Sequence, residues 1–279
     1  GKINIDSIDL NFNNKNNSLN LTLSAATDLK KSHLNAAVNI NAANDTVLTN
    51  LSWDNNNTTK LFAGEFIAQT ELSSNENFDT LITNTTILPT ELILQNKSWI
   101  IDQSTIWSDL KQIIVNNFKI HSNDDQLIAI NGIASKKQND TINIQLKDIS
   151  LDYIDELLPE ETEISFGGIV NGNAAIANTL TLPEINADVI SKNFFFDGSY
   201  FGTAVATCNF DHSTTSLRFD GTVIADNNDT TAILGGNYFI PNDSLDIKGK
   251  AYGIDVAFID YYLAEIFGRV KGNAWGDVH

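Results

Sequence analysis

The stretch Ile142-Asn-Ile-Gln-Leu146 shows the pattern that decides the fold, because three aliphatic residues alternate with two polar ones. Successive side chains of a β-strand point to opposite faces, so this alternation predicts a strand with one apolar and one polar face. The alternation then changes phase and continues in Ile149 and Leu151. A phase change of this kind indicates a β-bulge.

The same alternation recurs along most of the chain. It runs from Lys2 to Phe12 with a phase change at Ser7, and a strand pair at 113–120 changes phase at Asn116-Asn117. The apolar runs are separated by short stretches rich in Asn and Asp, which favour turns. The pattern therefore predicts about twenty short antiparallel strands, each with one apolar face.

A seven-residue phrase of the form G-x-V-x-G-x-A occurs twice, at 168–174 and 268–274, and an aromatic residue, an Ile and an Asp precede each copy. The two copies predict an internal repeat with a five-residue insertion in the first copy. Gly168 and Gly268 are expected to end helices, and Gly172 and Gly272 are expected to lie in the strands that follow. The repeat predicts three segments, 1–98, 99–174 and 175–279, which form one continuous structural domain cut from a longer chain.

A short helix is predicted before each phrase. The first begins at Asp152. The second has the apolar stripe of an amphipathic helix and is expected to cover one edge of the sheet. Its apolar residues are Phe258, Ile259, Tyr262, Leu263 and Ile266.

The composition narrows the choice of partners. The 279 residues are 42% hydrophobic, enough for a folded core, and the net charge is −18. A chain this acidic is expected to be repelled by nucleic acid and by anionic membrane surfaces. No apolar run reaches the length of a membrane-spanning helix.

Residues that could carry catalysis or bind a metal are few and scattered. Cys208 is the one cysteine, and the four histidines, His33, His121, His212 and His279, have no second ligand at metal-binding spacing. The carboxylates of 156–163 are typical of a solvated face. The sequence therefore predicts no catalytic residue, no metal site and no cofactor, and the protein is not expected to be an enzyme.

Six triplets have the form Asp, then Ser or Thr, then an apolar residue or Thr. They resemble an O-glycosylation acceptor known from some Gram-negative periplasms. Asp and Thr are also common in turns, so the triplets have a structural explanation as well. The hydroxyl residues are Ser7, Thr46, Thr80, Thr141, Thr230 and Ser244.

The alternating strand at 142–146, its phase change, the short helix and the twin phrase together resemble the TamB family of translocation and assembly module subunits. The resemblance extends over most of the chain and is best from about Trp99 to His279. It implies a periplasmic segment of a long protein, anchored in the inner membrane and meeting an outer-membrane barrel of the TamA or BamA type. It also implies phospholipid transport between the membranes, support of outer-membrane protein assembly, and no catalytic residues.

The resemblance implies an elongated, curved antiparallel sheet that forms a hydrophobic groove, the fold known as a β-taco, and the residue pattern adds two short amphipathic helices. Strands with one apolar face and few helices to cover them need another apolar surface or a ligand. The groove is expected to hold phospholipid acyl chains. Its predicted lining residues are Leu19, Leu21, Leu23, Ile142, Ile144, Leu146, Leu217, Phe219, Leu245 and Ile247.

One alternative remains open from the sequence. Two sheets that bury each other's apolar faces would form a β-sandwich, typical of a surface or secreted adhesin or carbohydrate-binding module. In that case the Asn-rich loops and Trp53 are expected to bind glycans.

Overall fold

The computed structural model describes residues 5–15, 18–29, 32–55, 62–77, 79–123, 125–153, 165–259 and 270–278. These residues form nineteen β-strands, which belong to one sheet, and two 3-10 turns. The predicted all-β class and antiparallel sheet are confirmed. All described strands share one sheet, whereas the alternative expected two.

The chain forms two compact units, and the boundary between them falls inside β12, after Ile144. The first unit also includes Ala177–Thr181. The repeat predicted three segments with boundaries after residues 98 and 174, whereas the two units meet after Ile144.

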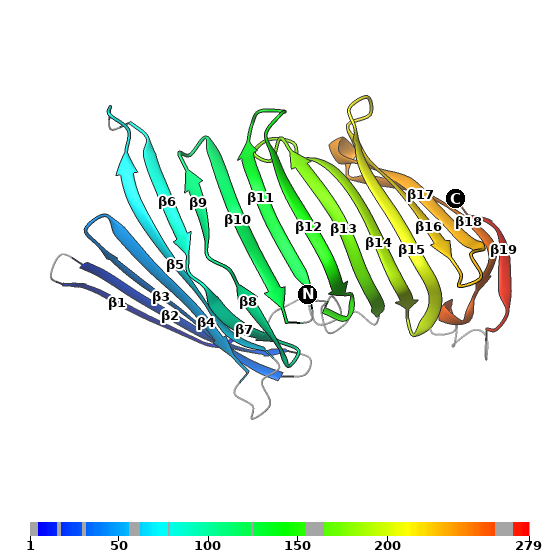
Figure 1. Ribbon diagram of the computed structural model, residues 1–279, viewed down its shortest axis with the longest axis horizontal. Coiled ribbons are helices and arrows are strands. Elements are labelled where there is room, and N and C mark those ends of the chain that lie inside the picture. Colours follow the sequence, from blue (N-terminus) through cyan, green and yellow to red (C-terminus); the bar gives the residue numbers. More distant parts are fainter. Residues whose placement is uncertain are drawn as a thin grey trace. The chain divides into compact units, whose positions relative to one another are not determined.

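The strands up to β11 belong to the first unit (Figure 1). They are β1 (Ile5–Lys15), β2 (Ser18–Leu29), β3 (Ser32–Ala43), β4 (Thr46–Asp54), β5 (Phe62–Ser74), β6 (Leu81–Ile87), β7 (Thr90–Leu94), β8 (Lys97–Ile101), β9 (Ser104–Ser108), β10 (Gln112–Ser122) and β11 (Leu127–Ser135).

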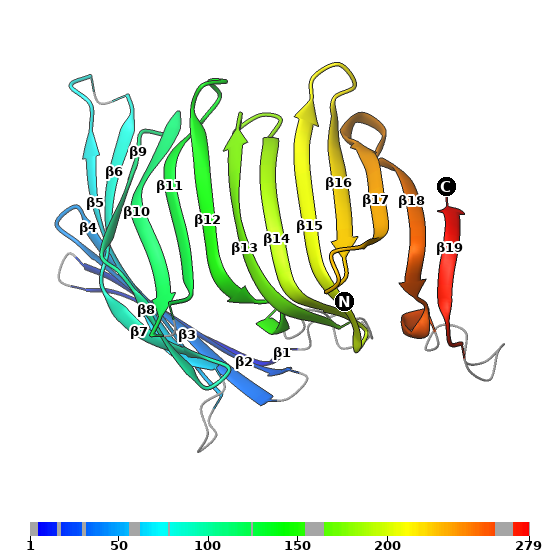
Figure 2. The same cartoon turned by 45° about the vertical axis from the view of Figure 1, so that its right-hand side comes forward.

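The second unit begins within β12 (Thr141–Ser150), and Figure 2 shows its later strands side by side in chain order. They are β13 (Phe166–Ala177), β14 (Glu184–Phe196), β15 (Ser199–Asp211), β16 (Ser216–Ile224), β17 (Thr230–Phe239), β18 (Ser244–Asp255) and β19 (Asn273–Val278). The 3-10 turns are η1 (Ile240–Asn242) and η2 (Ala257–Ile259).

Most strands pair with their neighbours in sequence, as expected for a meander, but two positions in the first unit are each filled by two short strands. β6 and β7 both pair with β5, and β9 and β8 both pair with β10. The interruptions lie at Leu88-Pro89 and at Asp102-Gln103, in neighbouring positions of the sheet. Pro89 has no N–H to donate to a neighbouring strand, which explains the first interruption.

The phase changes in the sequence mark real irregularities of the sheet. The register between β1 and β2 shifts between Ile5 and Ser7, and the register between β10 and β11 shifts between Val115 and Phe118. Asn117 has φ +54° and Asp148 has φ +51°, a conformation that Asn and Asp tolerate better than most residues. These bulges were predicted correctly because they preserve the one-sided pattern on either side of the shift.

The predicted helices fall mainly outside the described residues. Asp152 and Tyr153 are helical where the description stops, and Tyr262, Leu263 and Ile266 of the second helix are not described. Phe258 and Ile259 lie in η2. The prediction of an edge helix is therefore untested except at its first residues.

Phe258 fixes η2 to an aromatic cluster in the second unit. Its ring centroid lies 5.8 Å from that of Phe196 and 5.5 Å from that of Phe201, both in edge-on geometry. Phe196 also contacts Phe166, with centroids 5.5 Å apart. Edge-to-face arrangements of this kind stabilise aromatic pairs. The cluster therefore joins the end of β18 to the β14–β15 hairpin.

The glycine that matches Gly168 in backbone conformation is not the one that matches it in the repeated phrase. Gly168 has φ +127° and its carbonyl accepts a hydrogen bond from the N–H of Leu151 at 2.9 Å. Gly272 has φ +123° and accepts one from the N–H of Val256 at 3.0 Å. Gly168 and Gly272 thus occupy equivalent positions in the structure. The repeated phrase alone makes Gly168 equivalent to Gly268, which lies outside the described residues.

The predicted role of Gly168 as a helix C-cap is wrong, because Gly168 lies inside β13. Its positive φ is needed where the new strand begins beside β14, and a side chain there would collide with the backbone oxygens of Lys192 and Asn193. Gly172 lies in β13 as predicted, and a Cβ atom on it would stand 2.6 Å from the carbonyl oxygen of Asp188. The same prediction is wrong for Gly272, which lies immediately before β19 and not within it.

Candidate functional site

The candidate site of the first unit is built on one face of the sheet. Residues directly opposite each other in an antiparallel pair carry side chains on the same face. The strand register places Leu23 opposite Val38, Val38 opposite Leu51, and Leu51 opposite Phe66. An apolar row therefore crosses four strands.

The three predicted groove residues of β2 lie on this face. Leu21 is opposite Ile40, and Leu19 is opposite Ala42. The face continues onto β1, where Leu10 is 63% exposed and Phe12 is 61% exposed. Large aliphatic and aromatic side chains left this exposed next to each other on one strand are unusual for a surface that meets only water.

Farther along the same face, the apolar side chains surround a hollow of about 310 Å³ that we call the unit-1 hollow. Every residue lining it is apolar, and the lining comes from six strands. The lining residues are Leu51, Trp53, Phe66, Leu92, Leu94, Trp99, Ile101, Phe118, Ile120 and Ile128. The volume is at the lower end of the range usual for small-molecule sites.

Part of the wall of the hollow is closely packed around Gly64. Trp99 is 1% exposed and stands opposite Leu92, which stands opposite Gly64. Gly64 is in turn opposite Trp53. A Cβ atom on Gly64 would lie 2.6 Å from Cβ of Leu92 and 2.9 Å from Cζ2 of Trp53, so the glycine lets these side chains close over the backbone.

The residues of the hollow are absent from the lining predicted from the sequence. They follow the same alternation that predicted Leu19, Leu21 and Leu23, as in Leu51-x-Trp53 and Trp99-x-Ile101. Trp53, expected to bind glycans under the alternative, lies in β4 and lines the hollow. Extending the alternation through β4 and β8 would have placed these side chains on the apolar face.

Three predicted lining residues alternate on β12. Ile142, Ile144 and Leu146 are half-buried, while Asn143 and Gln145 between them are exposed. The period of two is as predicted.

The second unit has an apolar face of its own. Cys208 is opposite Phe219, Phe219 is opposite Gly236, and Gly236 is opposite Ile247. Next to this row, Leu217 and Leu245 are both opposite Tyr238, so the structure brings the four predicted groove residues of β16 and β18 together. We call these residues the unit-2 apolar face. Leu245 is 57% exposed.

The ring of Phe219 lies over its partner glycine. A Cβ atom on Gly236 would be 2.7 Å from Cζ of Phe219. Burial raises the pKa of the neighbouring Cys208 thiol, which leaves less of the reactive thiolate at neutral pH. These features fit the prediction that Cys208 is a structural thiol.

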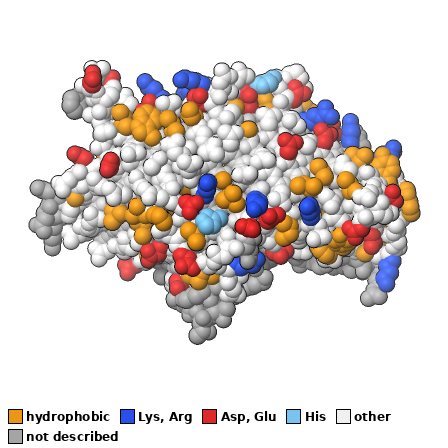
Figure 3. Space-filling view, in the orientation of Figure 1, with side chains coloured by type: hydrophobic (Ala, Val, Ile, Leu, Met, Phe, Trp, Pro, Cys, Tyr) orange, Lys and Arg blue, Asp and Glu red, His pale blue; other side chains and the backbone are white. Residues whose placement is uncertain are grey.

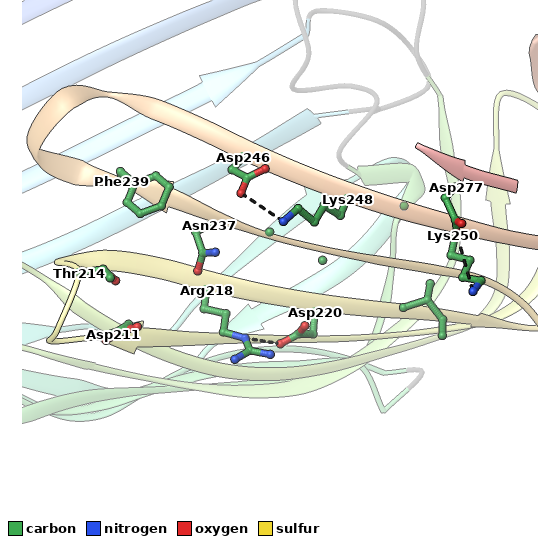
Figure 4. Close-up of a pocket in the computed structure, with 14 residues that line it drawn as sticks. Asp211, Thr214, Arg218, Asp220, Asn237, Phe239, Asp246, Lys248, Lys250 and Asp277 are labelled. Carbon is green, nitrogen blue, oxygen red and sulfur yellow. Dashed lines mark hydrogen bonds and ion pairs between the residues drawn. The ribbon is translucent and has the colours of Figure 1, made fainter. Parts of the chain in front are cut away.

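The opposite face of the second unit contains a larger, polar hollow of about 820 Å³ (Figure 4). Its cations are paired with carboxylates. Arg218 Nε lies 3.1 Å from Asp220 Oδ2, and Lys250 Nζ lies 3.7 Å from Asp277 Oδ1. Lys248 Nζ lies 4.0 Å from Oδ2 of Asp246, two residues earlier on the same strand. Exposed pairs such as these contribute about 0–1 kcal/mol, and their mixed charges are typical of a solvated sheet face.

The polar face of the first unit is built mainly from neutral groups. Asn41 Nδ2 donates to Asn20 Oδ1 on the neighbouring strand, and Thr22 Oγ1 donates to Asn39 Oδ1 at 2.9 Å. In one view of the molecule, hydrophobic side chains form patches separated by charged and neutral polar groups (Figure 3).

Other chemistry is sparse in the described part of the chain. No group of three or more His, Cys, Asp and Glu residues is placed there to hold a metal ion. His121 Nε2 lies 3.2 Å from Asp102 Oδ1 beside the interruption between β8 and β9, and His212 Nε2 lies 3.4 Å from Glu184 Oε2. Among the described residues, no helix has the length and apolarity to cross a membrane.

The chain matches no protein-family model, no curated protein and no solved structure. The resemblance to the TamB family therefore depends on the sequence motifs and stays a prediction.

Proposed function

We propose that this chain is a periplasmic segment of a TamB-like protein and conducts phospholipid between the inner and outer membranes along its apolar faces. The observation that supports the proposal is the apolar face of each unit, which the described chain leaves partly exposed. In the first unit this face leads into a hollow lined only by apolar side chains. Acyl chains are the apolar partners that an envelope protein meets in quantity.

Energetics favours transport over tight storage. Burying an acyl chain of about sixteen methylenes at roughly 0.8 kcal/mol each gives a gross of about 13 kcal/mol. A closed pocket that captured all of this would release its ligand slowly. An open face lets a sliding chain exchange one set of apolar contacts for an equivalent set, so that the net cost of each step is small.

The wider role follows from the family resemblance. The complete protein would be anchored in the inner membrane, would meet an outer-membrane barrel of the TamA or BamA type, and would support outer-membrane protein assembly. The chain itself supplies the apolar path and no catalytic group. The resemblance to the family is the support for these partners and for the periplasmic location.

A charge placed on the apolar face tests the proposal. In the full-length protein, Ile144→Asp and Phe219→Asp are expected to abolish support of the outer-membrane barrier, because a carboxylate in the lipid path must lose water or block the chain. Asn143→Asp is the matched control, since it adds the same charge one residue away at an exposed position. Barrier function is measured as resistance to a large apolar antibiotic.

Two further measurements separate a transport defect from unfolding and from another function. Far-UV circular dichroism should show the same strand content in all variants. Native mass spectrometry of wild-type protein should detect bound phospholipid, and Phe219→Asp should reduce it. Normal barrier function in both aspartate variants, or the absence of lipid together with binding to a glycan array, would refute the proposal and favour the adhesin.

A further inference from the structure

The Asp-Ser/Thr triplets share one place in the fold. Thr46, Thr141, Thr230 and Ser244 are each the first residue of a strand, and Thr80 immediately precedes β6. The preceding Asp residue lies in each case in the turn or connection that leads into the strand. Ser7, in contrast, lies within β1.

The alternation of the strands sets the direction of the hydroxyl groups. Val47 follows Thr46 and lies on the apolar face with Leu51, and Leu245 follows Ser244 and lies on the unit-2 apolar face. The hydroxyl residues therefore lie on the polar face. A group attached to them would extend into water and leave the apolar faces free.

Among the described residues, the hydroxyls of Thr46 and Ser244 bond within their own turns. Ser244 Oγ donates to Asn242 Oδ1 at 3.0 Å, and Thr46 Oγ1 makes a long contact of 3.5 Å with the carbonyl oxygen of Asn44. Neither hydroxyl residue is buried. Converting such a hydroxyl into a glycoside would forfeit one local hydrogen bond and disturb no packed side chain.

We propose that Thr46 and Ser244 are O-glycosylated at the polar rim of the sheet, in the sequence context Asp-Ser/Thr-apolar. This proposal is independent of lipid transport. In the transfer, the hydroxyl oxygen bonds to the anomeric carbon of a sugar activated as a diphosphate. The bond from that carbon to the diphosphate oxygen breaks, the diphosphate leaves with the electron pair, and a base of the transferase takes the hydroxyl proton.

The preceding aspartates allow a sharp test. Asp45 has φ +60° and Asp243 has φ +50°, and Asn adopts this conformation as readily as Asp. Asp45→Asn and Asp243→Asn therefore keep the turn and the hydroxyl and replace the carboxylate with a neutral amide, whose oxygen at position 243 can still accept the hydrogen bond from Tyr238 Oη. Thr46→Val removes the hydroxyl and keeps a residue that suits a strand. Thr222→Val is the control, because Thr222 lies within β16 and follows Gly221.

The readout is peptide mass spectrometry of the full-length protein isolated from its own cell envelope. Peptides containing Thr46 or Ser244 are expected to carry a sugar mass that disappears in Thr46→Val and in the matching Asp→Asn variant, but not in Thr222→Val. A sugar on either residue that needs its Asp supports the proposal. Unmodified peptides at both residues, or modification that persists in the Asp→Asn variants, would overturn it without affecting the lipid proposal.

Discussion

Gly64 offers a prediction whose sign can be worked out from the structure. A Cβ atom at this position would lie 2.6 Å from Cβ of Leu92 and 2.9 Å from Cζ2 of Trp53. Leu92 is 5% exposed and has little room to move. Overpacking of this kind costs about 1–3 kcal/mol, which exceeds the roughly 0.4–1 kcal/mol gained when Ala restricts the unfolded chain. Gly64→Ala is therefore expected to destabilise the first unit.

Gly221 is the matched control for this substitution. It also lies in a strand without a positive φ, but the nearest atom to an added Cβ would be 3.7 Å away, an ordinary van der Waals distance. Gly221→Ala should therefore gain the entropic term without a clash. At about 2–4 °C per kcal/mol, Gly64→Ala is expected to lower the melting temperature by about 1–8 °C and Gly221→Ala to raise it by about 1–4 °C.

The assay can distinguish the two units. Trp53, Trp99 and Trp107 belong to the first unit and Trp275 to the second, so tryptophan fluorescence follows mainly the unit that contains Gly64. Far-UV circular dichroism follows both units. If Gly64→Ala raised the melting temperature as Gly221→Ala does, the close approach described for the wall of the hollow would be refuted.

A double-mutant cycle tests the same point more directly. Leu92→Gly removes the Cβ atom that the added methyl group would meet, so Gly64→Ala should cost less in that background than in wild type, with a coupling of about 0.5–3 kcal/mol between contacting residues. Additive effects would show that the added methyl group collides elsewhere.

Two further predictions concern the second unit. Cys208 should react with a maleimide more slowly than a free thiol at neutral pH, because its raised pKa moves thiolate formation to higher pH. The reaction rate should rise with pH and on denaturation. A rate unchanged by denaturation would contradict the burial of the thiol. Phe258→Ala should loosen η2, because it removes two aromatic contacts of about 0.5–1.5 kcal/mol each. Amide exchange at Ile259, whose N–H donates to the carbonyl oxygen of Val256, should accelerate while the global melting temperature changes little. Unchanged protection of this amide would contradict the role of Phe258.

The fold was predictable because its determinant is local. In each strand, the alternation of apolar and polar residues shows which side chains lie on which face, as in Ile142-x-Ile144. Each bulge appears as a phase change in this alternation, as at Asn116-Asn117. Residues that share a face within a hairpin could therefore be named from the sequence, and the register brings Leu217 and Leu245 together through Tyr238.

The hollow could not be predicted in the same way, since it depends on register across several strands. Gly64 and Leu92 are opposite each other only because the β6–β7 strand is interrupted at Pro89 and resumes one residue out of step with β5. Alternation shows which side chains share a face but not which of them meet across strands. The correspondence of Gly168 with Gly272 was likewise hidden, because it is defined by backbone conformation and a hydrogen bond, whereas the repeated letters favour Gly268.

The two polar faces differ in how they should respond to the surrounding electrolyte. The bonds of Asn20 with Asn41 and of Thr22 with Asn39 join neutral groups, so dissolved ions do not screen them. The pair of Lys250 with Asp277 joins β18 to β19, is exposed, and weakens as counterions accumulate. When the salt concentration rises, β18 and β19 should therefore lose part of the attraction between their side chains, while β2 and β3 keep theirs.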